Sequence, residues 1–289
     1  MSLILIRIYA ALIGATVGSF LNVCVYRWPR ELSVVSPRSA CPDCQQPIAW
    51  YHNIPILGYI ILRGRCAGCK GKISIQYPLV ELATALIWLA MTVRYGVGME
   101  AFQGAILLTL LLGIALTDAK HMVIPDHFTL GGTVAGLIFA GAATDWSAFL
   151  GPEATRPESA VAWIGYLFNS GAAPLLRSVI GAALGYGVMR GVAIAGEWAF
   201  RKPALGLGDV HMMAMVGAFL GAQGVLLTIL LGSVLGLVIG VPITWIRGKL
   251  VRMNTYLPLG VFLAMGAAIA HAWGDDIIRW YIEFAFGGY

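Results

Sequence analysis

Long apolar runs separated by short polar segments make up most of the chain. Uncharged runs of about 17–21 residues, enough to cross the hydrocarbon core of a bilayer, recur along it. They predict helices at 4–26, 79–95, 101–119, 127–144, 174–199, 209–221, 223–246 and 256–273. We therefore predict an all-α polytopic membrane protein with about eight transmembrane helices.

The composition agrees with this pattern. Of the 289 residues, 59% are hydrophobic and only 11% are charged, whereas a soluble domain of this length carries about 25% charged residues. The composition therefore excludes an ordinary soluble globular domain. The net charge of +5 says less than the positions of the basic residues.

One apolar stretch has an unusual length. Residues 210–246 contain no Asp, Glu, Lys or Arg, which is too long for one crossing and short for two. The stretch therefore predicts a tight hairpin that turns near residues 221–224. Its first arm would be unusually short, and that arm begins at Asp209.

Lysine and arginine are divided unevenly between the two ends of the predicted helices. One side receives Arg27, Arg30, Arg38, Arg63, Arg65, Lys70, Lys72, Lys120, Arg201, Lys202, Arg247, Lys249 and Arg252, and the other receives Arg7, Arg94, Arg156, Arg177 and Arg279. Because short cytoplasmic loops are enriched in basic residues, we expect the first side to be cytoplasmic. Both termini then lie outside, and Asp118 and Asp209 lie at the cytoplasmic face.

Three regions follow from this topology. Residues 1–26 are transmembrane helix 1, residues 27–77 form a small cytoplasmic loop domain between helices 1 and 2, and residues 78–289 form the transmembrane core. Near 145–173, a segment with prolines and charges interrupts the core, and we interpret it as an external loop.

The loop domain contains two Cys-x-x-Cys pairs, Cys41 with Cys44 and Cys66 with Cys69. Four thiolates at this spacing suit a tetrahedral zinc site. Two disulfides are the alternative, but the reducing cytosol argues against them. A site closed by four cysteines leaves no position for a substrate, so we predict a structural zinc that supplies folding energy to a loop with few apolar side chains.

Two aspartates stand at the borders of apolar runs. Asp118 lies in Thr117-Asp118-Ala119, and Asp209 lies in Gly206-Leu207-Gly208-Asp209. Carboxylates at membrane depth are costly, so two at matching depth indicate a site. In an aspartyl protease, an ionised carboxylate takes a proton from the attacking water, and a protonated one polarises the scissile carbonyl. We predict that Asp118 and Asp209 are such a catalytic pair.

Helix capping is the structural alternative for Asp209, since Asp after Gly is a common N-cap. Asp118 has no such alternative, because nothing structural favours a carboxylate at a helix C-terminus. Asp126 follows Pro125 in the first turn of the next helix, and we assign it a structural role. The helix dipole favours charge at Asp209, so we expect Asp209 to be ionised and Asp118 to hold the proton.

At these residues the chain resembles a type IV prepilin peptidase, a member of the GxGD aspartyl proteases. The resemblance covers nearly the whole chain and rests on motifs in a fixed order. These are Gly-Ser-Phe-Leu-Asn-Val at 18–23, the cysteine pairs, Asn-Ile-Pro-Ile-Leu-Gly-Tyr at 53–59, Leu-Arg-Gly-Arg-Cys at 62–66, Ile-Ser at 73–74, Tyr-Pro-Leu-Val-Glu-Leu at 77–82, the phrase from Asp118 to Ile124-Pro125, and Gly206-x-Gly208-Asp209.

The resemblance implies a multi-pass enzyme of the bacterial inner membrane that works in secretion or pilus systems. It would cut the short basic leader from type IV prepilins or pseudopilins on the cytoplasmic side, with Asp118 and Asp209 as the catalytic residues. Members with the cysteine loop also methylate the new N-terminal amine with S-adenosylmethionine. Asn22, Asn53 and Glu81 could line that cofactor's site or satisfy backbone groups. We expect prepilins and membrane lipid as partners, and no nucleic acid.

The chain departs from the family in two places. His211 stands where many members carry Lys, and residues 256–261, Tyr-Leu-Pro-Leu-Gly-Val, replace a Pro-Phe-Gly-Pro phrase. Neither change removes a catalytic group.

Two other functions compete with the protease. A transporter or proton channel with an aspartate relay predicts polar residues across the bilayer, yet the centres of helices 101–119 and 209–221 are apolar. A methyltransferase without protease activity would use the aspartates only as helix caps.

Overall fold

Helices are the only regular secondary structure in the described part of the chain. The computed structural model describes residues 3–144, 173–202, 205–242 and 258–286. Its elements are α1 (Leu3–Arg27), η1 (Trp28–Arg30), η2 (Trp50–Asn53), α2 (Leu57–Ile61), α3 (Gln76–Tyr95), α4 (Met99–His121), α5 (Asp126–Ala143), α8 (Ala173–Phe200), α9 (Leu207–Leu235), η4 (Gly236–Gly240) and α11 (Leu259–Phe286). Only isolated bridges, Ala40 with Pro47 and Arg65 with Lys72, join extended backbone in these residues.

Six helices of the described chain are long and apolar enough to cross a membrane. They are Leu3–Arg30, Gln76–Tyr95, Met99–His121, Ala173–Phe200, Leu207–Gly240 and Leu259–Ala285. The protein is therefore an all-α, multi-pass membrane protein. Helix α5 is not among the six, and α9 with η4 counts as one helix, so the eight crossings stay a prediction.

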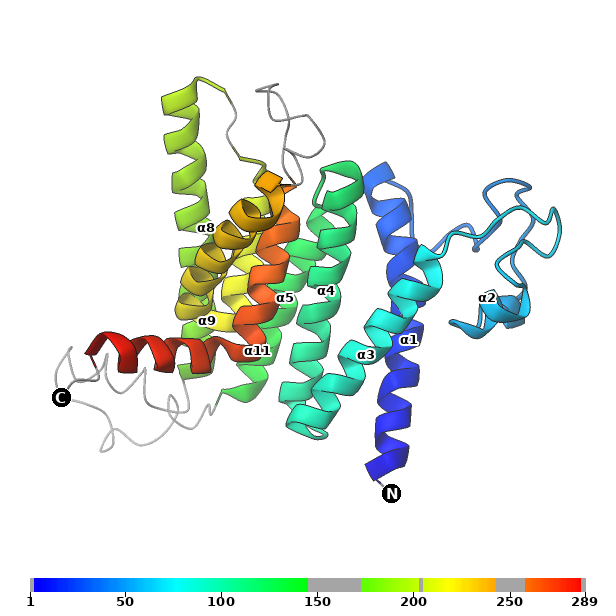
Figure 1. The fold of residues 1–289 in the computed structure, drawn as a ribbon, viewed down its shortest axis with the longest axis horizontal. Helices are drawn as coiled ribbons and strands as arrows, with labels where there is room; N and C mark the ends of the chain where they lie inside the picture. Colours follow the sequence, from blue (N-terminus) through cyan, green and yellow to red (C-terminus); the bar gives the residue numbers. More distant parts are fainter. Residues whose placement is uncertain (1–2, 145–172, 203–204, 243–257, 287–289) are drawn as a thin grey trace. The chain divides into compact units, whose positions relative to one another are not determined.

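The boundaries of five predicted helices are confirmed. Those at 4–26, 79–95, 101–119, 127–144 and 174–199 match observed helices to within three residues. The end predicted at 273 is wrong, because α11 continues to Phe286. Asp275 and Asp276 end the apolar run without ending the helix, and Figure 1 shows the last, red part of α11 turned away from its first, orange part. Nearly all of the external loop predicted near 145–173 lies outside the described residues.

The chain folds as two compact units, Met1–Gly113 and Ile114–Tyr289. In the first unit, α1 packs against α3 through small residues (Figure 1). A Cβ on Gly14 would lie 2.7 Å from the Thr84 carbonyl oxygen, and one on Gly18 would lie 2.8 Å from Glu81 Cα. The two glycines therefore permit the close approach of these helices.

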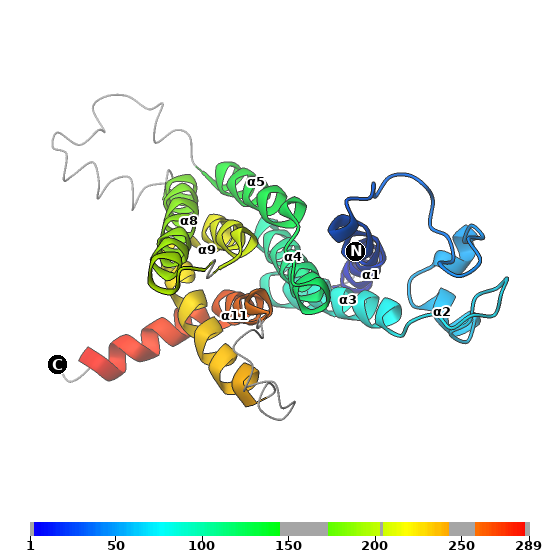
Figure 2. The same cartoon turned by 90° about the horizontal axis from the view of Figure 1, so that it is seen from above.

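In the second unit, α9 reverses its direction at Gly221, inside the segment where the hairpin was predicted. Gly221 has φ 70° and ψ −175°, in the left-handed region that favours glycine. Before the reversal, α9 packs against α8 and α5; after it, Gly232 and Gly236 pack against Phe262 of α11. Figure 2 shows the two arms as separate helices, the first in yellow and the second in gold.

The first arm of α9 is the core of the second unit. Val210, Met212, Met213, Met215 and Val216 are fully buried. At 1.5 Å per residue this arm is roughly 20 Å long, which is shorter than the hydrocarbon core of about 30 Å. Its buried residues are apolar, which agrees with the apolar centre expected from the sequence.

Backbone contact between α8 and α9 holds this arm in place. A Cβ on Gly217 would collide with the Gly181 carbonyl, and one on Gly185 would collide with the Met213 carbonyl. The hydroxyl of Ser178 donates a 2.6 Å hydrogen bond to the Ala218 carbonyl oxygen across the same contact. Small interface residues let membrane helices approach this closely.

We expect Gly217→Val to destabilise the protein, because its side chain cannot fit against the Gly181 backbone. Forcing extra carbon atoms into a packed contact costs about 1–3 kcal/mol or more. Thermal unfolding in detergent should show a lower Tm than for the matched control Gly187→Val, since Gly187 on α8 has no atom within 4 Å of its Cβ position. Equal Tm values for the two variants would contradict this packing.

Candidate active site and metal site

Asp118 lies near the end of α4 and is held by the start of α11. The residue is only 6% exposed. The Val261 N–H donates to Asp118 Oδ2 at 3.1 Å, and the Gly260 N–H also donates to the carboxylate. A Cβ on Gly260 would lie 2.9 Å from Oδ2, so a larger residue there would displace the carboxylate. Helix α4 ends soon afterwards, where Met122 adopts a φ of 53°.

Asp209 is in the first turn of α9, three residues after the N-cap residue Gly206, which has no side chain with which to cap the helix. The Gly206 N–H donates to the Asp209 carboxylate. The Asp209 N–H donates to the Gly206 carbonyl at 3.2 Å. Its Oδ1 is buried and has no hydrogen-bond partner among the described residues. Since native structures rarely leave a buried polar atom unsatisfied, this atom indicates a functional role rather than a cap.

The two aspartates meet where α4, α9 and α11 converge. Their carboxyl groups are close enough to interact electrostatically. Ile124, in the connection from α4 to α5, contacts the starts of α9 and α11. A Cβ on Gly208 would lie 2.8 Å from Ile124 Cβ, and one on Gly260 would lie 2.7 Å from Ile124 Cδ1.

Hydrogen bonding points to a different proton location from the one that the helix dipole predicted. A hydrogen bond to a charged group contributes about 1.5–3 kcal/mol, whereas a helix terminus contributes about 0.3–1 kcal/mol to a nearby charge. Asp118 accepts the N–H groups of Val261 and Gly260. Asp209 accepts only that of Gly206, and its Oδ1 accepts none among the described residues. The negative charge is therefore better stabilised on Asp118.

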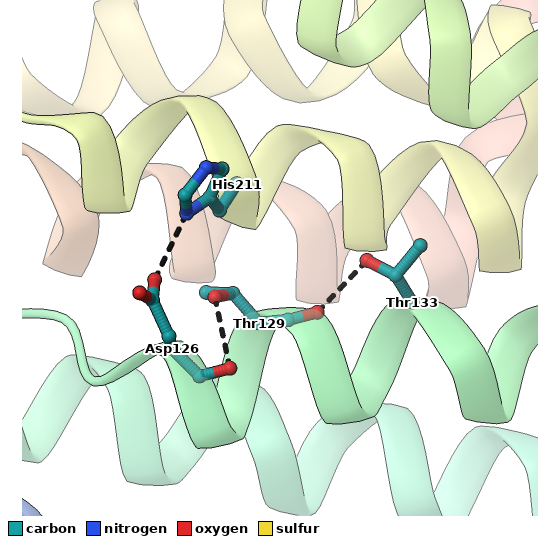
Figure 3. Close-up of polar contacts among 4 residues, drawn as sticks. All are labelled: Asp126, Thr129, Thr133 and His211. Atoms are coloured by element: carbon teal, nitrogen blue, oxygen red, sulfur yellow. Dashed lines mark hydrogen bonds and ion pairs between the residues drawn. The ribbon is translucent and has the colours of Figure 1, made fainter.

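Asp126, assigned a structural role from the sequence, begins α5 but makes no cap hydrogen bond. Its Oδ1 lies 2.9 Å from His211 Nδ1 on α9, as Figure 3 shows. Thr129 and Thr133 donate hydrogen bonds to backbone carbonyls within α5. Asp126 thus links the starts of α5 and α9.

Sequence reasoning missed three residues that shape the aspartate site: Ile124, Gly260 and Val261. The last two belong to the altered phrase at 256–261, whose first two residues lie outside the described chain. Val261 acts through its backbone N–H, which no side-chain pattern reveals. The available signals were the departure of this phrase from the family pattern and, for Ile124, its place in the family phrase that ends at Ile124-Pro125.

The four cysteines of the loop domain form a cluster of the size that a tetrahedral metal site needs. Their sulfur atoms all lie within 4.8 Å of one another. Sγ of Cys41 is 3.8 Å from that of Cys69, and Sγ of Cys44 is 4.0 Å from that of Cys66. Zinc bonded to sulfur at about 2.3 Å would place the sulfurs about 3.8 Å apart. The four are free thiols, so the disulfide alternative is not formed.

Two matching turns build this cluster. The Cys41 carbonyl accepts the Gln45 N–H at 2.9 Å, and the Cys66 carbonyl accepts the Lys70 N–H at 3.1 Å. Gln45 and Lys70 adopt φ values of 58° and 62°. The two Cys-x-x-Cys pairs therefore fold alike and present their thiols to one point.

The thiols differ in acidity. Backbone N–H groups of Cys69 and Gly68 donate to the Cys66 sulfur and lower its pKa to about 7. The Gly71 N–H stabilises the Cys69 thiolate, but desolvation and the three neighbouring thiols outweigh it and raise that pKa to about 11. Metal ligation requires thiolates, so a bound divalent cation must displace at least the Cys69 proton.

Two of the three residues that the sequence offers for cofactor binding make hydrogen bonds to the backbone. Asn22 is buried, and its amide donates to the Tyr77 carbonyl at 3.1 Å. Glu81 is buried, and its Oε2 accepts the Ile56 N–H at 2.7 Å. Ile56 has a φ of 63°, which is strained for a β-branched residue. Asn53 is exposed at the end of η2.

Two family descriptions match the chain. Residues 105–241, which include both aspartates, match the type IV leader peptidase family. The chain belongs to this family. Residues 12–95, which include the four cysteines, match the bacterial peptidase A24 N-terminal domain.

Relatives match most of the chain and carry the name prepilin leader peptidase/N-methyltransferase. That of Aeromonas salmonicida is 34% identical and covers 94% of this chain and 92% of its own length. That of Pseudomonas aeruginosa is 33% identical, and the match covers 95% of this chain and 92% of the relative. That of Myxococcus xanthus is 36% identical, and the match covers 85% of this chain and 65% of the relative. No solved structure matches the chain.

We expect purified protein to hold one zinc ion per chain and Cys44→Ser to lose most of it, because a tetrahedral site needs all four thiolates. Zinc content should also fall as pH decreases from about 8 to about 5, since protons then compete for the sulfurs. Elemental analysis of purified protein measures both effects. Cys24→Ala is the control, because Cys24 lies in α1 outside the cluster. Full zinc content in Cys44→Ser would contradict the site.

Proposed function

We propose that this protein is a membrane aspartic endopeptidase that removes the leader from type IV prepilins or pseudopilins and then methylates the new N-terminus. The family, and relatives named prepilin leader peptidase/N-methyltransferase, support the reaction class. One observation supports the residue assignment most strongly. Asp209 keeps a buried, partnerless oxygen beside a second carboxyl group, Asp118, which capping does not explain.

In the proposed reaction, Asp118 is the ionised member and Asp209 the protonated one. Asp118 takes a proton from water as the water oxygen bonds to the scissile carbonyl carbon, while Asp209 gives its proton to the carbonyl oxygen. The amide nitrogen then takes the proton from Asp118 as its bond to carbon breaks, and Asp209 recovers a proton from the second hydroxyl. The Val261 N–H keeps Asp118 oriented in both steps.

We place the aspartate pair at the cytoplasmic face of the inner membrane, with about eight crossings in all. Basic residues such as Lys120, Arg201 and Lys202, at the same ends of the helices as the aspartates, support this orientation. A substrate whose own apolar helix lies in the bilayer is already confined to two dimensions. Its cleavage site would reach the boundary at the depth of Asp118, so the site gains proximity at little entropic cost.

Two bound groups belong to this proposal. A structural zinc ion held by Cys41, Cys44, Cys66 and Cys69 would stabilise the loop domain, as the separations of the sulfurs allow. S-adenosylmethionine would supply the methyl group for the new amine. The hydrogen bonds of Asn22 and Glu81 to Tyr77 and Ile56 support a role for both side chains in positioning the loop domain.

The transporter alternative receives no support from the described helices. A proton relay needs polar groups along its path, but Met212, Met213 and Val216 fill the first arm of α9 beyond Asp209. A methyltransferase that used Asp209 only as a cap is also disfavoured, since capping leaves its buried Oδ1 beside Asp118 unexplained.

Replacing either aspartate by asparagine should abolish cleavage, with a loss of at least about 10³-fold in kcat. Purified protein would be incubated with a prepilin and a labelled methyl donor, and mass shifts would report cleavage and methylation. Methylation of pre-cleaved pilin should persist in Asp118→Asn and Asp209→Asn, which shows that they fold. Asp275→Asn, at an exposed aspartate of α11, is the matched control. Normal cleavage by either catalytic variant would overturn the assignment.

Gly260→Ala should also impair cleavage, by about 10²-fold, because its Cβ would displace the Asp118 carboxylate and Ile124. The same mass-shift assay measures the loss. Gly131→Ala serves as the control, since its Cβ position in α5 is open. If both variants cleave like the unmodified protein, contact between α11 and Asp118 is not needed for activity.

A further inference from the structure

The pair formed by His211 and Asp126 lies beside the aspartate site but is not explained by the reaction. His211 Nδ1 and Asp126 Oδ1 are 2.9 Å apart (Figure 3). The His211 ring also stacks on Tyr186 of α8, with centroids 6.2 Å apart and an interplanar angle of 16°. The imidazole is therefore fixed by two other helices.

The pair joins the segments on which both catalytic carboxylates depend. His211 follows Asp209 by two residues in α9, and Asp126 follows Ile124 by two residues at the start of α5. Ile124 in turn contacts the backbone beside each aspartate, at Gly208 and at Gly260. A hydrogen bond between α5 and α9 here fixes the start of α9 against the Ile124 connection.

Glycines make this fixation necessary. Gly206 and Gly208 flank Leu207 at the start of α9, so the chain before Asp209 carries few side chains that could hold it. The N-cap residue Gly206 has no side chain with which to order the turn. His211 is the first polar side chain after Asp209 that contacts another helix in the described structure.

We propose that His211 and Asp126 form a clasp that positions Asp209 against Asp118. This inference rests on the proposed function. The clasp is the Nδ1–H···Oδ1 hydrogen bond, which the neutral Nδ1–H tautomer and the imidazolium can both donate. Neither residue touches the substrate; both are positioning residues. Small displacements of a catalytic group cost large factors in rate, so their effect falls on kcat.

The main alternative is an ordinary surface ion pair. Asp126 is 60% exposed and the His211 side chain is 23% exposed, and exposed pairs add little to stability. The two interpretations predict different results. A surface pair changes neither kcat nor Tm measurably, whereas a clasp changes kcat and leaves Tm nearly constant.

The experiment compares purified full-length protein with Asp126→Ala, His211→Phe and the double variant. Phenylalanine keeps the stacking surface for Tyr186 and removes only the hydrogen bond. Each single variant should lower kcat for leader cleavage by about 10–100-fold and keep KM within about twofold. The kcat of the double variant should equal that of the less active single variant, because the two substitutions remove the same hydrogen bond.

His211→Lys tests rescue, since a lysine ammonium can also donate to Asp126. It should recover kcat to within about fivefold of the unmodified protein. Methylation of pre-cleaved pilin should stay within about twofold in every variant, which controls for folding. Additive losses in the double variant, unchanged kcat in both single variants, or no recovery with lysine would each overturn the clasp.

A spectroscopic measurement separates failure of the clasp from failure of the proposed function. The protein has five histidines, so ¹⁵N-histidine labelling gives few signals, and His211→Phe assigns the one of interest. Asp126→Ala should shift the His211 Nδ1 resonance, as expected when its acceptor is removed. No shift would overturn the clasp even if the protein cleaved no prepilin.

Discussion

The site depends on one constraint: a carboxylate at the edge of a membrane needs hydrogen-bond donors, and the backbone at the start of α11 supplies them. Val261 donates to Asp118 Oδ2 at 3.1 Å, while Gly260 packs against the same carboxylate without a side chain between them. This contact brings residues far apart in the sequence together and stabilises charge on one aspartate. The neighbouring Asp209 lacks such donors for its buried Oδ1. This difference supports the different roles that we propose for the two groups.

In the second unit, close packing at glycines positions the helix that carries Asp209. Gly217 and Gly181 bring α9 against α8 at backbone distance, and Gly221 lets α9 turn back after a short first arm. The arm is therefore closely packed and buried, although Gly206 and Gly208 flank Leu207 at its start. Asp209 needs this support because the glycines at the start of its helix have no side chains. Ile124 completes the contact between α9 and α11.

The sequence predicts the helices and the cysteine cluster well, because both depend on local patterns. Apolar runs give helix boundaries directly, and the spacing of Cys41, Cys44, Cys66 and Cys69 suffices to predict a metal site. The end of α11 escapes this method, since charges at a membrane boundary do not stop a helix.

Contacts made by backbone groups or by residues distant in the chain leave no such pattern. Val261 acts through an N–H, and the partner of His211 lies 85 positions away. Local sequence patterns also do not reveal which of Asp118 and Asp209 holds the proton. The helix dipole favours charge on Asp209, but hydrogen bonds that only the fold reveals are stronger and favour Asp118. The most direct test is an experimental structure with a peptide analogue whose hydroxyl mimics the attacking water. The account predicts that the hydroxyl lies within about 2.6–3.2 Å of both carboxylates while Val261 still donates to Asp118. A hydroxyl bound by one aspartate alone, with the other turned away, would contradict it.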